Sequence, residues 1–274
     1  MTKWNLIIDV AECHNCNNCV VAAKDELAGN RFAGYSAPHP AQGRGVIWIE
    51  RRVRGSAHHV DAAYLPRLCN HCADAPCVRA APGAVRQRED GIVVFDPDKC
   101  RGRRDLVDVC PYGAVVWNDA EQLPQTWFFD AHLLDAGWHA PRCVSVCPTG
   151  AIEAVKTDDA TMSERAAREG LRTLAPERGT RPRVHYRNLQ RIDHAFVGGS
   201  VVAAGECAHD VEVRLEQAGR PLATTRTDTF GDFRFDGLQP GHYSVRIDDP
   251  AGSAESTLEL GSESVVLGDL HLRT

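Results

Sequence analysis

The pattern of apolar and polar positions changes near residue 199, after which apolar and polar residues alternate. In VEVRL (211–215) the apolar positions are Val211, Val213 and Leu215, and YSVRI (243–247) repeats the alternation. A period of two places the apolar side chains on one face of a strand, and short strands separated by turns predict a small β-sandwich over 199–274. We expect its turns at FGD (230–232), DG (236–237) and PG (240–241).

Short apolar runs in the first half of the chain lead into cysteines and repeat one another. IIDVAEC (7–13) resembles VFDPDKC (94–100), and CPYGAV (110–115) resembles CPTGAI (147–152). APGAV (81–85) is a shortened third copy with Ala81 at the cysteine position. A strand, a cysteine loop and Cys-Pro-x-Gly-Ala before a second strand make up half of a bacterial ferredoxin, in which Pro ends the loop and Gly permits the turn. The repeats predict two fused ferredoxin-like modules within 1–156.

Two other segments complete the predicted α+β fold. Residues 24–66 lack cysteine and contain one apolar strand, GVIWIE (45–50), so we expect a surface insertion that either meets a partner or covers the domain. TMSERAAREG (161–170) is predicted to be a helix, with Thr161 and Glu164 as a capping box and Gly170 as its stop. This helix and a connecting segment fill 157–198.

The composition narrows the class of protein. The chain has 274 residues, 43% hydrophobic and 25% charged, which suits one or two soluble globular domains. A formal charge of −6 without a long like-charge run argues against a nucleic-acid partner. No run of 18 apolar residues exists, so we expect no transmembrane segment. MTKWNLIIDV is too short and too interrupted for a secretory signal, so we expect a cytoplasmic location. Without an export signal, the 11 cysteines favour metal or redox cofactors over disulfides.

The cysteines form two triplets and two single donors. CHNCNNC (13–19) and CNHCADAPC (69–77) each offer three thiols, and two Cys-Pro pairs offer one more each. A [4Fe–4S] cluster takes three thiolates from a tight loop and a fourth from a distant Cys-Pro. Three plus one, taken twice, predicts two clusters, and spacing alone leaves open which donor meets which loop. The eight candidate ligands are Cys13, Cys16, Cys19, Cys69, Cys72, Cys77, Cys110 and Cys147.

Other interpretations of these residues explain less. Zinc bound by CHNC and CNHC would leave Cys19, Cys77 and both Cys-Pro donors without a role. Catalytic thiol chemistry has no matched base in the sequence. We expect Cys207 to be a small buried hydrophobe, and the paired histidines at 58–59 to be a solvated loop rather than a metal site.

In order along the chain, the four cysteine groups resemble those of the iron–sulfur subunits of the dimethyl-sulfoxide-reductase superfamily of molybdopterin enzymes. In that family the first group exchanges ligands with the fourth, and the second with the third. The resemblance therefore implies one cluster on Cys13, Cys16, Cys19 and Cys147, and another on Cys69, Cys72, Cys77 and Cys110.

The family pattern has four clusters, and this chain departs from it at two of them. One further site would use positions that hold Ala23, Trp127, Asp130 and Cys143, and the other would use Ala81, Cys100, Arg103 and Leu106. One cysteine cannot hold a cubane, so both clusters are expected to be absent. Protein interiors do not tolerate large cavities, so we predict that Trp127 or a neighbouring phenylalanine fills the space of the first absent cluster.

Two resemblances define the expected function. TDTFGDFRFDGLQPGHYSVRI (227–247) resembles carboxypeptidase-regulatory or transthyretin-like domains. A double-ferredoxin domain followed by a helix and a sandwich is similar to the small subunits of the pyrogallol–phloroglucinol transhydroxylase and resorcinol hydroxylase type. The likeness covers nearly the whole chain and includes the segments IDVAECHNCNNC, NHCADAPCV and QREDGIVVFDP. That resemblance implies a non-catalytic electron-transfer subunit in a heterodimer or larger complex. Its large partner would carry molybdenum bis-pterin guanine dinucleotide and act on a polyhydroxylated phenol. The alternatives are a structural scaffold, a subunit of another molybdopterin reductase or dehydrogenase, and a free-standing ferredoxin.

Overall fold

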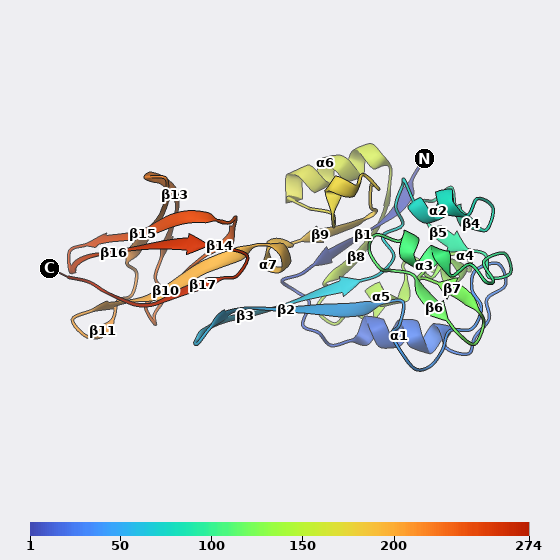
Figure 1. Ribbon diagram of the computed structural model, residues 1–274, viewed down its shortest axis with the longest axis horizontal. Helices are drawn as coiled ribbons and strands as arrows, with labels where there is room; N and C mark the ends of the chain where they lie inside the picture. Colours follow the sequence, from blue (N-terminus) through green and yellow to red (C-terminus); the bar gives the residue numbers. More distant parts are fainter. Residues whose placement is uncertain (274) are drawn as a thin grey trace. The chain divides into compact units, whose positions relative to one another are not determined.

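The apolar run KWNLIID forms β1 (Lys3–Asp9), the central strand of a three-stranded sheet. In the computed structural model, which describes residues 1–273, β1 pairs antiparallel with β8 (Ile152–Thr157) and parallel with β9 (Val184–Arg187) (Figure 1). Five consecutive β1 residues from Trp4 to Ile8 are buried. Neighbours on both edges and cover on both faces explain why this strand is mostly apolar and does not alternate, with Asn5 as its one buried polar residue.

Helix α6 (Asp159–Glu169) packs on this sheet through an apolar cluster of Ile7, Met162 and Leu171. Its N-cap is Asp158, whose carboxylate accepts the Thr161 backbone N–H at 2.9 Å. The predicted Thr161 capping box is therefore wrong, because the aspartate three residues earlier satisfies the first-turn donor. The predicted stop is confirmed, since Gly170 caps the helix with a left-handed φ of 62°.

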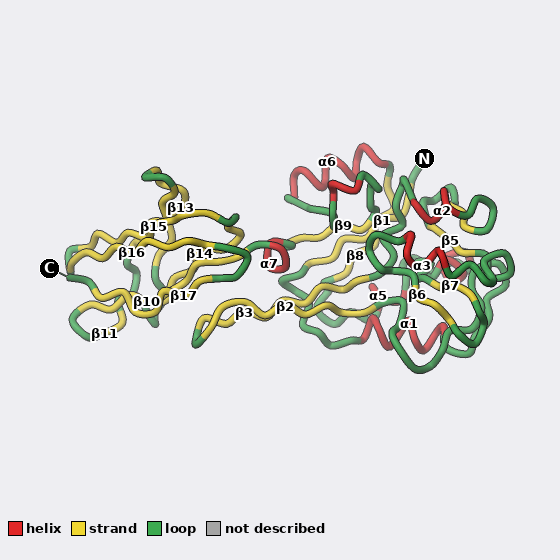
Figure 2. The backbone as a smooth tube through the Cα atoms, in the orientation of Figure 1, coloured by secondary structure: helices red, strands yellow, loops and turns green. Residues whose placement is uncertain are grey.

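Short helices and strands alternate with long loops in this part of the chain (Figure 2). Six of the eight candidate ligands lie in loops, and only Cys19 and Cys77 lie in helices. Two small antiparallel ladders join β4 (Val85–Gln87) to β5 (Val93–Phe95) and β6 (Val116–Asn118) to β7 (Leu123–Gln125). No helix of the described part of the chain is long and apolar enough to cross a membrane. Besides α6, the helical segments before residue 190 are α1 (Asn18–Leu27), α2 (Pro76–Ala80), α3 (Asp105–Val109), α4 (Ala131–Asp135), α5 (Arg142–Ser145) and the 3-10 turn Pro176–Arg178.

The boundaries of the two compact units differ from those expected. One unit comprises Met1–Glu50 and Tyr64–Leu189, and the other comprises Arg51–Ala63 and the chain from Gln190 onward. The boundary expected at 198/199 falls inside β10 (Ala195–Ala203). The segment 24–66 is more than a surface insertion, because Val46 and Ile47 are buried and the hairpin of β2 (Trp48–Ser56) and β3 (His59–Arg67) contributes its tip to the second unit. The division of one hairpin between two units leaves no periodicity signal in a sequence.

The second unit is a β-sandwich, as the alternating pattern predicts. One sheet has the order β11-β10-β14 with β17 on β10, and the other has the order β13-β12-β15-β16. Apolar residues from both sheets, among them Val197, Val213, Phe235 and Val245, share one core. The strands, after β10 and the short helix α7 (Gln190–Asp193), are β11 (Glu206–Cys207), β12 (Glu212–Gln217), β13 (Arg220–Arg226), β14 (Asp232–Leu238), β15 (Gly241–Asp249), β16 (Gly252–Leu260) and β17 (Val265–His271).

The turn expected at 236–237 is wrong. Asp236 and Gly237 lie inside β14, where the ladder with β10 shifts register near Ala195. Gly237 adopts a φ of 74° at this irregularity, which is the backbone conformation that favours glycine. The Asp-Gly pair therefore marks a bulge within a strand rather than the end of one.

Candidate iron–sulfur centres

The first cysteine triplet and the Cys-Pro of the fourth group come together in the first unit. Cys13 and Cys16 lie on the loop that enters α1, Cys19 lies in the first turn of α1, and Cys147 follows α5. Negative charge on Cys13, Cys16 or Cys147 raises the pKa of Cys19, so these sulfurs lie near one another. Cys19 is buried, whereas Cys16 is exposed. Four thiols therefore face one another at a place that is partly open to the surface.

Polar contacts between α1 and α5 bring these distant segments together. Asn18 Nδ2 donates to the Val146 carbonyl oxygen at 3.3 Å, across 128 residues of chain. Arg142 at the start of α5 pairs with Asp25 Oδ2 at 3.0 Å and with Glu26. Glu26 in turn accepts from His132 Nε2 at 2.8 Å. The charged half of α1, which carries no cysteine, thus positions Cys147.

The second triplet meets Cys110 in the same way. Negative charge on Cys110 raises the pKa of Cys69, Cys72 and Cys77, and charge on Cys72 also raises that of Cys77. Cys77 lies in α2 directly after Pro76, whose missing N–H is not needed at the start of a helix. Cys110 ends α3, and the Ala114 backbone N–H donates to its Sγ at 3.4 Å. Cys72 is buried, and Cys69, Cys77 and Cys110 are half-buried.

A segment that the sequence marks only as a connection covers the second group. Ala73 N and Asp74 N donate to the carbonyl oxygens of Arg181 and Thr180, at 2.8 and 3.0 Å. The buried Thr180 hydroxyl hydrogen-bonds the Cys72 thiol and lowers its pKa, and it also contacts the Tyr112 hydroxyl. Thr180 is more than 100 residues from Cys72 in a polar stretch, so nothing in the sequence singles it out.

Burial and mutual repulsion hold these thiols protonated unless a cation joins them. Burial raises the pKa of Cys19 and Cys72 to about 11, and that of Cys77 to about 12. The neighbouring sulfurs raise each pKa further, because several negative charges would otherwise share one desolvated space. Four such thiols suit a centre that supplies positive charge and takes thiolates as ligands. The donor set therefore fits an iron–sulfur cluster.

The spacing of the sulfurs argues against zinc. Thiolates on one tetrahedral zinc ion lie about 3.8 Å apart, because each Zn–S bond is about 2.3 Å long. Within the part of the chain that the structure describes, the one set of three metal-binding side chains whose ligand atoms lie within 4.8 Å of one another contains no cysteine. No three of the sulfurs therefore lie as close together as the thiolates on one zinc ion. A cubane places each thiolate on a different iron, so it takes sulfurs that lie farther apart.

The positions of one missing family cluster are filled by protein. Trp127, Phe128 and Phe129 are all buried, and the Trp127 Nε1–H donates to Asp130 Oδ1 at 3.1 Å. Asp130 also accepts the Arg142 backbone N–H at 2.8 Å, so its carboxylate is already occupied. Burial and the neighbouring Asp130 raise the pKa of Cys143 well above its usual range. These contacts support the expectation that Trp127 fills this space.

The positions of the other missing cluster belong to an apolar core. Ala81, Cys100 and Leu106 are buried in one hydrophobic cluster. The Cys100 thiol donates to the Ala84 carbonyl oxygen at 3.4 Å. Arg103, at the remaining position, pairs with the carboxylate of Asp105 at 2.7 Å and donates to the Ala80 carbonyl oxygen. Cys100 is the only one of these four side chains that could bind iron, because the Arg103 guanidinium is a cation.

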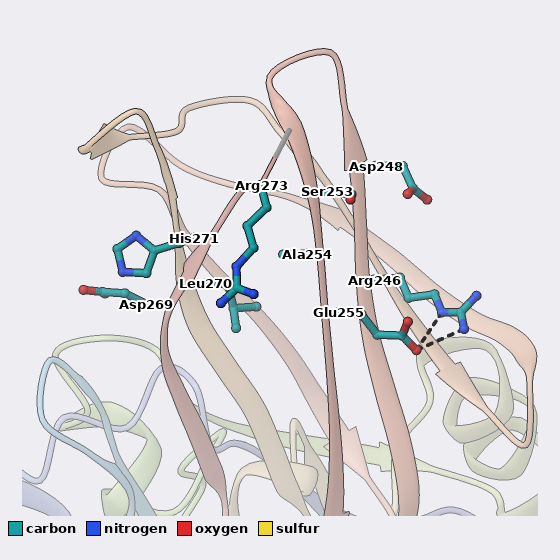
Figure 3. A pocket seen from close by; sticks show the side chains of 9 residues that line it. All are labelled: Arg246, Asp248, Ser253, Ala254, Glu255, Asp269, Leu270, His271 and Arg273. Carbon is teal, nitrogen blue, oxygen red and sulfur yellow. Dashed lines mark hydrogen bonds and ion pairs between the residues drawn. The ribbon is translucent and has the colours of Figure 1, made fainter.

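Other candidate sites lie in the second unit. Cys207 is exposed on the short edge strand β11, so the expectation that it is buried is wrong. A hollow of about 500 Å³ between the ends of β15, β16 and β17 is lined by both acidic and basic side chains (Figure 3). Arg246 pairs there with Glu255 at 3.0 Å. Mixed and partly neutralised charge gives this hollow no preference for one kind of ion.

The expectation that His58 and His59 form a solvated loop is correct only for the first of them. His58 is exposed, but the His59 side chain is only 8% exposed. Its Nε2 lies 3.7 Å from Asp232 Oδ1. The sequence offers no sign that a hairpin tip meets β14.

Comparison with known families agrees with both units. The 4Fe–4S dicluster domain family matches residues 60–157, and the SdrD B-like domain family matches residues 201–272. The chain therefore carries iron–sulfur clusters of the 4Fe–4S kind and a separate β domain. A 5-hydroxyisourate hydrolase from Klebsiella pneumoniae covers 29% of this chain and 92% of its own, with 16% identity and a TM-score of 0.25, which is too low to support an argument.

Known relatives extend the match to the whole chain. The pyrogallol hydroxytransferase small subunit of Pelobacter acidigallici is 41% identical, covering 99% of this chain and 100% of its own. One of the subunits of the tetrathionate reductase of Salmonella typhimurium is 36% identical, covering 71% and 75%. One of the polypeptides of the anaerobic dimethyl sulfoxide reductase of Escherichia coli is 32% identical, covering 68% and 85%. The chain belongs to the family of electron-transferring iron–sulfur subunits of molybdopterin enzymes that includes the pyrogallol hydroxytransferase small subunit.

Proposed function

We propose that this subunit holds two [4Fe–4S] clusters and exchanges electrons with a large molybdopterin subunit that acts on a polyhydroxylated phenol such as pyrogallol or resorcinol. The ligands would be Cys13, Cys16, Cys19 and Cys147 for one cluster, and Cys69, Cys72, Cys77 and Cys110 for the other. The observation that carries the proposal is the convergence of two groups of four thiols from loops far apart in sequence.

The chain's own residues support a charge-carrying role at each group. When bound, the clusters would supply reversible one-electron chemistry, which side chains cannot. Arg44 and Arg67 flank the turn after Cys110, because both donate to backbone carbonyl oxygens there, of Gly113 and Tyr112. Cations beside a thiolate group favour the more negative, reduced state. The exposed Cys16 leaves the first group accessible to a partner.

The number of clusters rests on the two filled positions. Asp130 is held by Trp127 and Arg142, and Cys143, the one cysteine among these positions, lies near Cys19 and Cys147 of the first group. Cys100 is the one cysteine among the four positions of the second missing cluster, and it lies in an apolar cluster that also contains Cys72. Neither position offers the four thiolates that a cubane takes. We therefore propose two clusters where the family pattern has four.

The partner, fold and location follow from the family. We propose a heterodimer or larger complex in which the large chain carries molybdenum bis-pterin guanine dinucleotide, as the family resemblance implies. We also propose that the cysteine-bearing unit is a duplicated ferredoxin-like domain, because repeated Cys-Pro-x-Gly-Ala segments end both cysteine groups. The sandwich would belong to the transthyretin-like or carboxypeptidase-regulatory type. Eleven free thiols suit a reducing, cytoplasmic location.

Metal analysis of the anaerobically purified complex tests this proposal. We expect about eight irons per copy of this chain and co-purification with a larger molybdenum-containing chain. Cys147→Ala should change the EPR signal of one cluster and Cys110→Ala that of the other. Cys143→Ala is the matched control and should change neither. An iron count far from eight, zinc in place of iron, or loss of iron in the control would contradict the ligand assignment.

A scaffold role is the second candidate, because the whole second unit contains a single cysteine, Cys207, and so offers no cluster site of its own. Freeze-quenched EPR during turnover with pyrogallol or resorcinol separates the two roles. Electron transfer requires that at least one cluster changes redox state within a turnover. Clusters that stay in one state throughout would favour the scaffold.

A further inference from the structure

We propose that His58, His59 and Asp232 form a binding site for a divalent transition-metal ion, with zinc as its best match, in the second unit. The site is separate from the cysteine groups and does not depend on the proposed electron-transfer function. It would join the tip of the β2–β3 hairpin to the sandwich strands of the same unit.

The geometry of three ligand atoms carries this proposal. The two histidine nitrogens and one Asp232 oxygen all lie within 4.8 Å of one another. His59 Nε2 and Asp232 Oδ1 are 3.7 Å apart. Ligand atoms on a tetrahedral zinc ion lie about 3.4 Å apart, because Zn–N and Zn–O bonds are about 2.1 Å long. Small side-chain movements therefore suffice to complete the site.

One hydroxyl group stands where the three side chains converge. Ser200 Oγ lies 3.1 Å from His58 Nε2 and 3.3 Å from His59 Nε2, and it donates to Asp232 Oδ1 at 2.6 Å. Ser200 and Asp232 are cross-strand partners of β10 and β14, so their separation is set by the ladder. A cation bound between these three side chains would replace the hydrogen bonds that they now make to the Ser200 hydroxyl.

The ligand set is rigid on one side and adaptable on the other. His59 is held against β10, where a Cβ on Gly198 would lie only 3.5 Å from His59 Nδ1. Gly55 in the same hairpin approaches Phe196 so closely that a Cβ would lie 2.5 Å from the ring. His58 is exposed on the turn, and its ring centroid lies 4.4 Å from that of His59 at an angle of 45°. A fixed imidazole, a fixed carboxylate and a movable imidazole suit capture of an ion from solution.

The charges around the site do not oppose a cation. Asp232 and Asp228 contribute negative charge near His59, while Arg234 contributes positive charge. Arg234 is itself paired with Asp236 at 2.8 Å and Asp61 at 3.3 Å, which offsets its effect. Two histidines and one carboxylate leave a fourth position for water, as in known three-ligand zinc sites.

The test uses the full-length, iron-loaded chain supplied anaerobically with one equivalent of Zn²⁺. Bound zinc is counted by mass spectrometry, and its ligands are identified by X-ray absorption at the zinc edge. We expect about one zinc per chain, with only nitrogen and oxygen neighbours at about 2.0–2.1 Å. A sulfur shell at about 2.3 Å would mean that the ion sits on cysteines and would overturn the proposal.

Variants separate a metal site from a simple hydrogen-bonded cluster. Losing a mere supporting contact costs about 10–100-fold in metal affinity, so His59→Ala and Asp232→Asn should each cost about 100-fold or more. Exposed His58→Ala, which leaves the fold intact, should also lose zinc. Ser200→Ala should keep zinc, because its hydroxyl is displaced by the ion. His242→Ala, an exposed histidine on β15 of the same unit, is the matched control and should bind as wild type.

Two further results would overturn the inference. Wild-type protein that takes up no zinc would show that Ser200 only ties a polar cluster together. Zinc uptake that survives in His58→Ala, with circular dichroism unchanged, would place the ion elsewhere.

Discussion

Arg54 is a buried cation on which the second unit depends. Its side chain is 0% exposed on β2. It donates to Asp61 Oδ2 at 2.6 Å and to both oxygens of Asp236 at 2.8 and 3.0 Å. It also donates to the His194 carbonyl oxygen at 3.1 Å. Replacing Arg54 by alanine removes all of these charge-assisted hydrogen bonds and leaves their acceptors in a poorly hydrated place.

The contacts that remain set the size of the effect. Breaking a buried ion pair costs about 3–5 kcal/mol when the other charge is left uncompensated. Asp61 would keep Arg191 at 2.6 Å, and Asp236 would keep Arg234 at 2.8 Å. Neither carboxylate becomes an orphan, so we expect the lower end, about 3 kcal/mol of unfolding free energy. That value corresponds to about a 100-fold increase in opening of the unit.

The distribution of tryptophan allows each unit to be followed separately. Trp4, Trp48, Trp117, Trp127 and Trp138 all lie in the first unit. Hydrogen exchange of peptides from β10 and β14 reports on the second. We expect Arg54→Ala to speed exchange in both strands about 100-fold and to leave the urea midpoint of tryptophan fluorescence unchanged.

A surface arginine of the same unit is the control. Arg246 pairs with Glu255 at 3.0 Å, and both side chains are about half exposed. Exposed pairs contribute about 0–1 kcal/mol, so Arg246→Ala should change exchange by less than about fivefold. Exchange in Arg54→Ala that stays within that range would refute the reasoning. Equal destabilisation of the tryptophan transition would show that the network does not act on the second unit alone.

Further predictions concern the first unit and the free thiols. Trp127→Ala should lower the free energy of unfolding by about 3–5 kcal/mol in a urea titration followed by circular dichroism, with iron content retained. Burial lowers the pKa of His39 to about 4, whereas the histidine of the unfolded chain takes up a proton near pH 6.5. The free energy of unfolding of the wild type should therefore fall by about 2 kcal/mol between pH 7 and pH 5. In His39→Gln this fall should be smaller by the same amount. An unchanged difference between the two proteins would count against this linkage. Cys207→Ser should alter neither melting temperature nor iron content, measured on the same preparation, since its thiol is exposed.

The elements that the sequence predicts well are those with local causes. Alternation in 211–215 and 243–247 identifies two sandwich strands, because burial on one face of a strand imposes it residue by residue. Gly170 ends α6 because the left-handed cap is a property of a single residue. The two cysteine triplets are likewise local, since a tight loop must place three thiols within reach of one centre.

The sequence fails where distant segments decide a residue's surroundings. The exposure of Cys207 depends on β11 being an edge strand, which residues 206–207 do not reveal. Thr161 has the right residue type for a cap, but Asp158 competes for the same N–H. Thr180 touches Cys72 only because its loop folds back over residues 73–74. Each error arises from a contact, not from a wrong propensity.

By itself, the amino-acid sequence determined the kind of centre, its eight candidate thiols and the β character of the last 75 residues or so, because spacing and alternation are written into short stretches. Only the tertiary structure brought Cys147 to the first loop and Cys110 to the second, and set the hairpin tip with His58 and His59 against Asp232. Bringing each Cys-Pro cysteine to its distant loop costs conformational entropy, and contacts between segments far apart in the sequence must offset this cost. Those contacts, such as Asn18 with Val146, have no signature before the chain has folded.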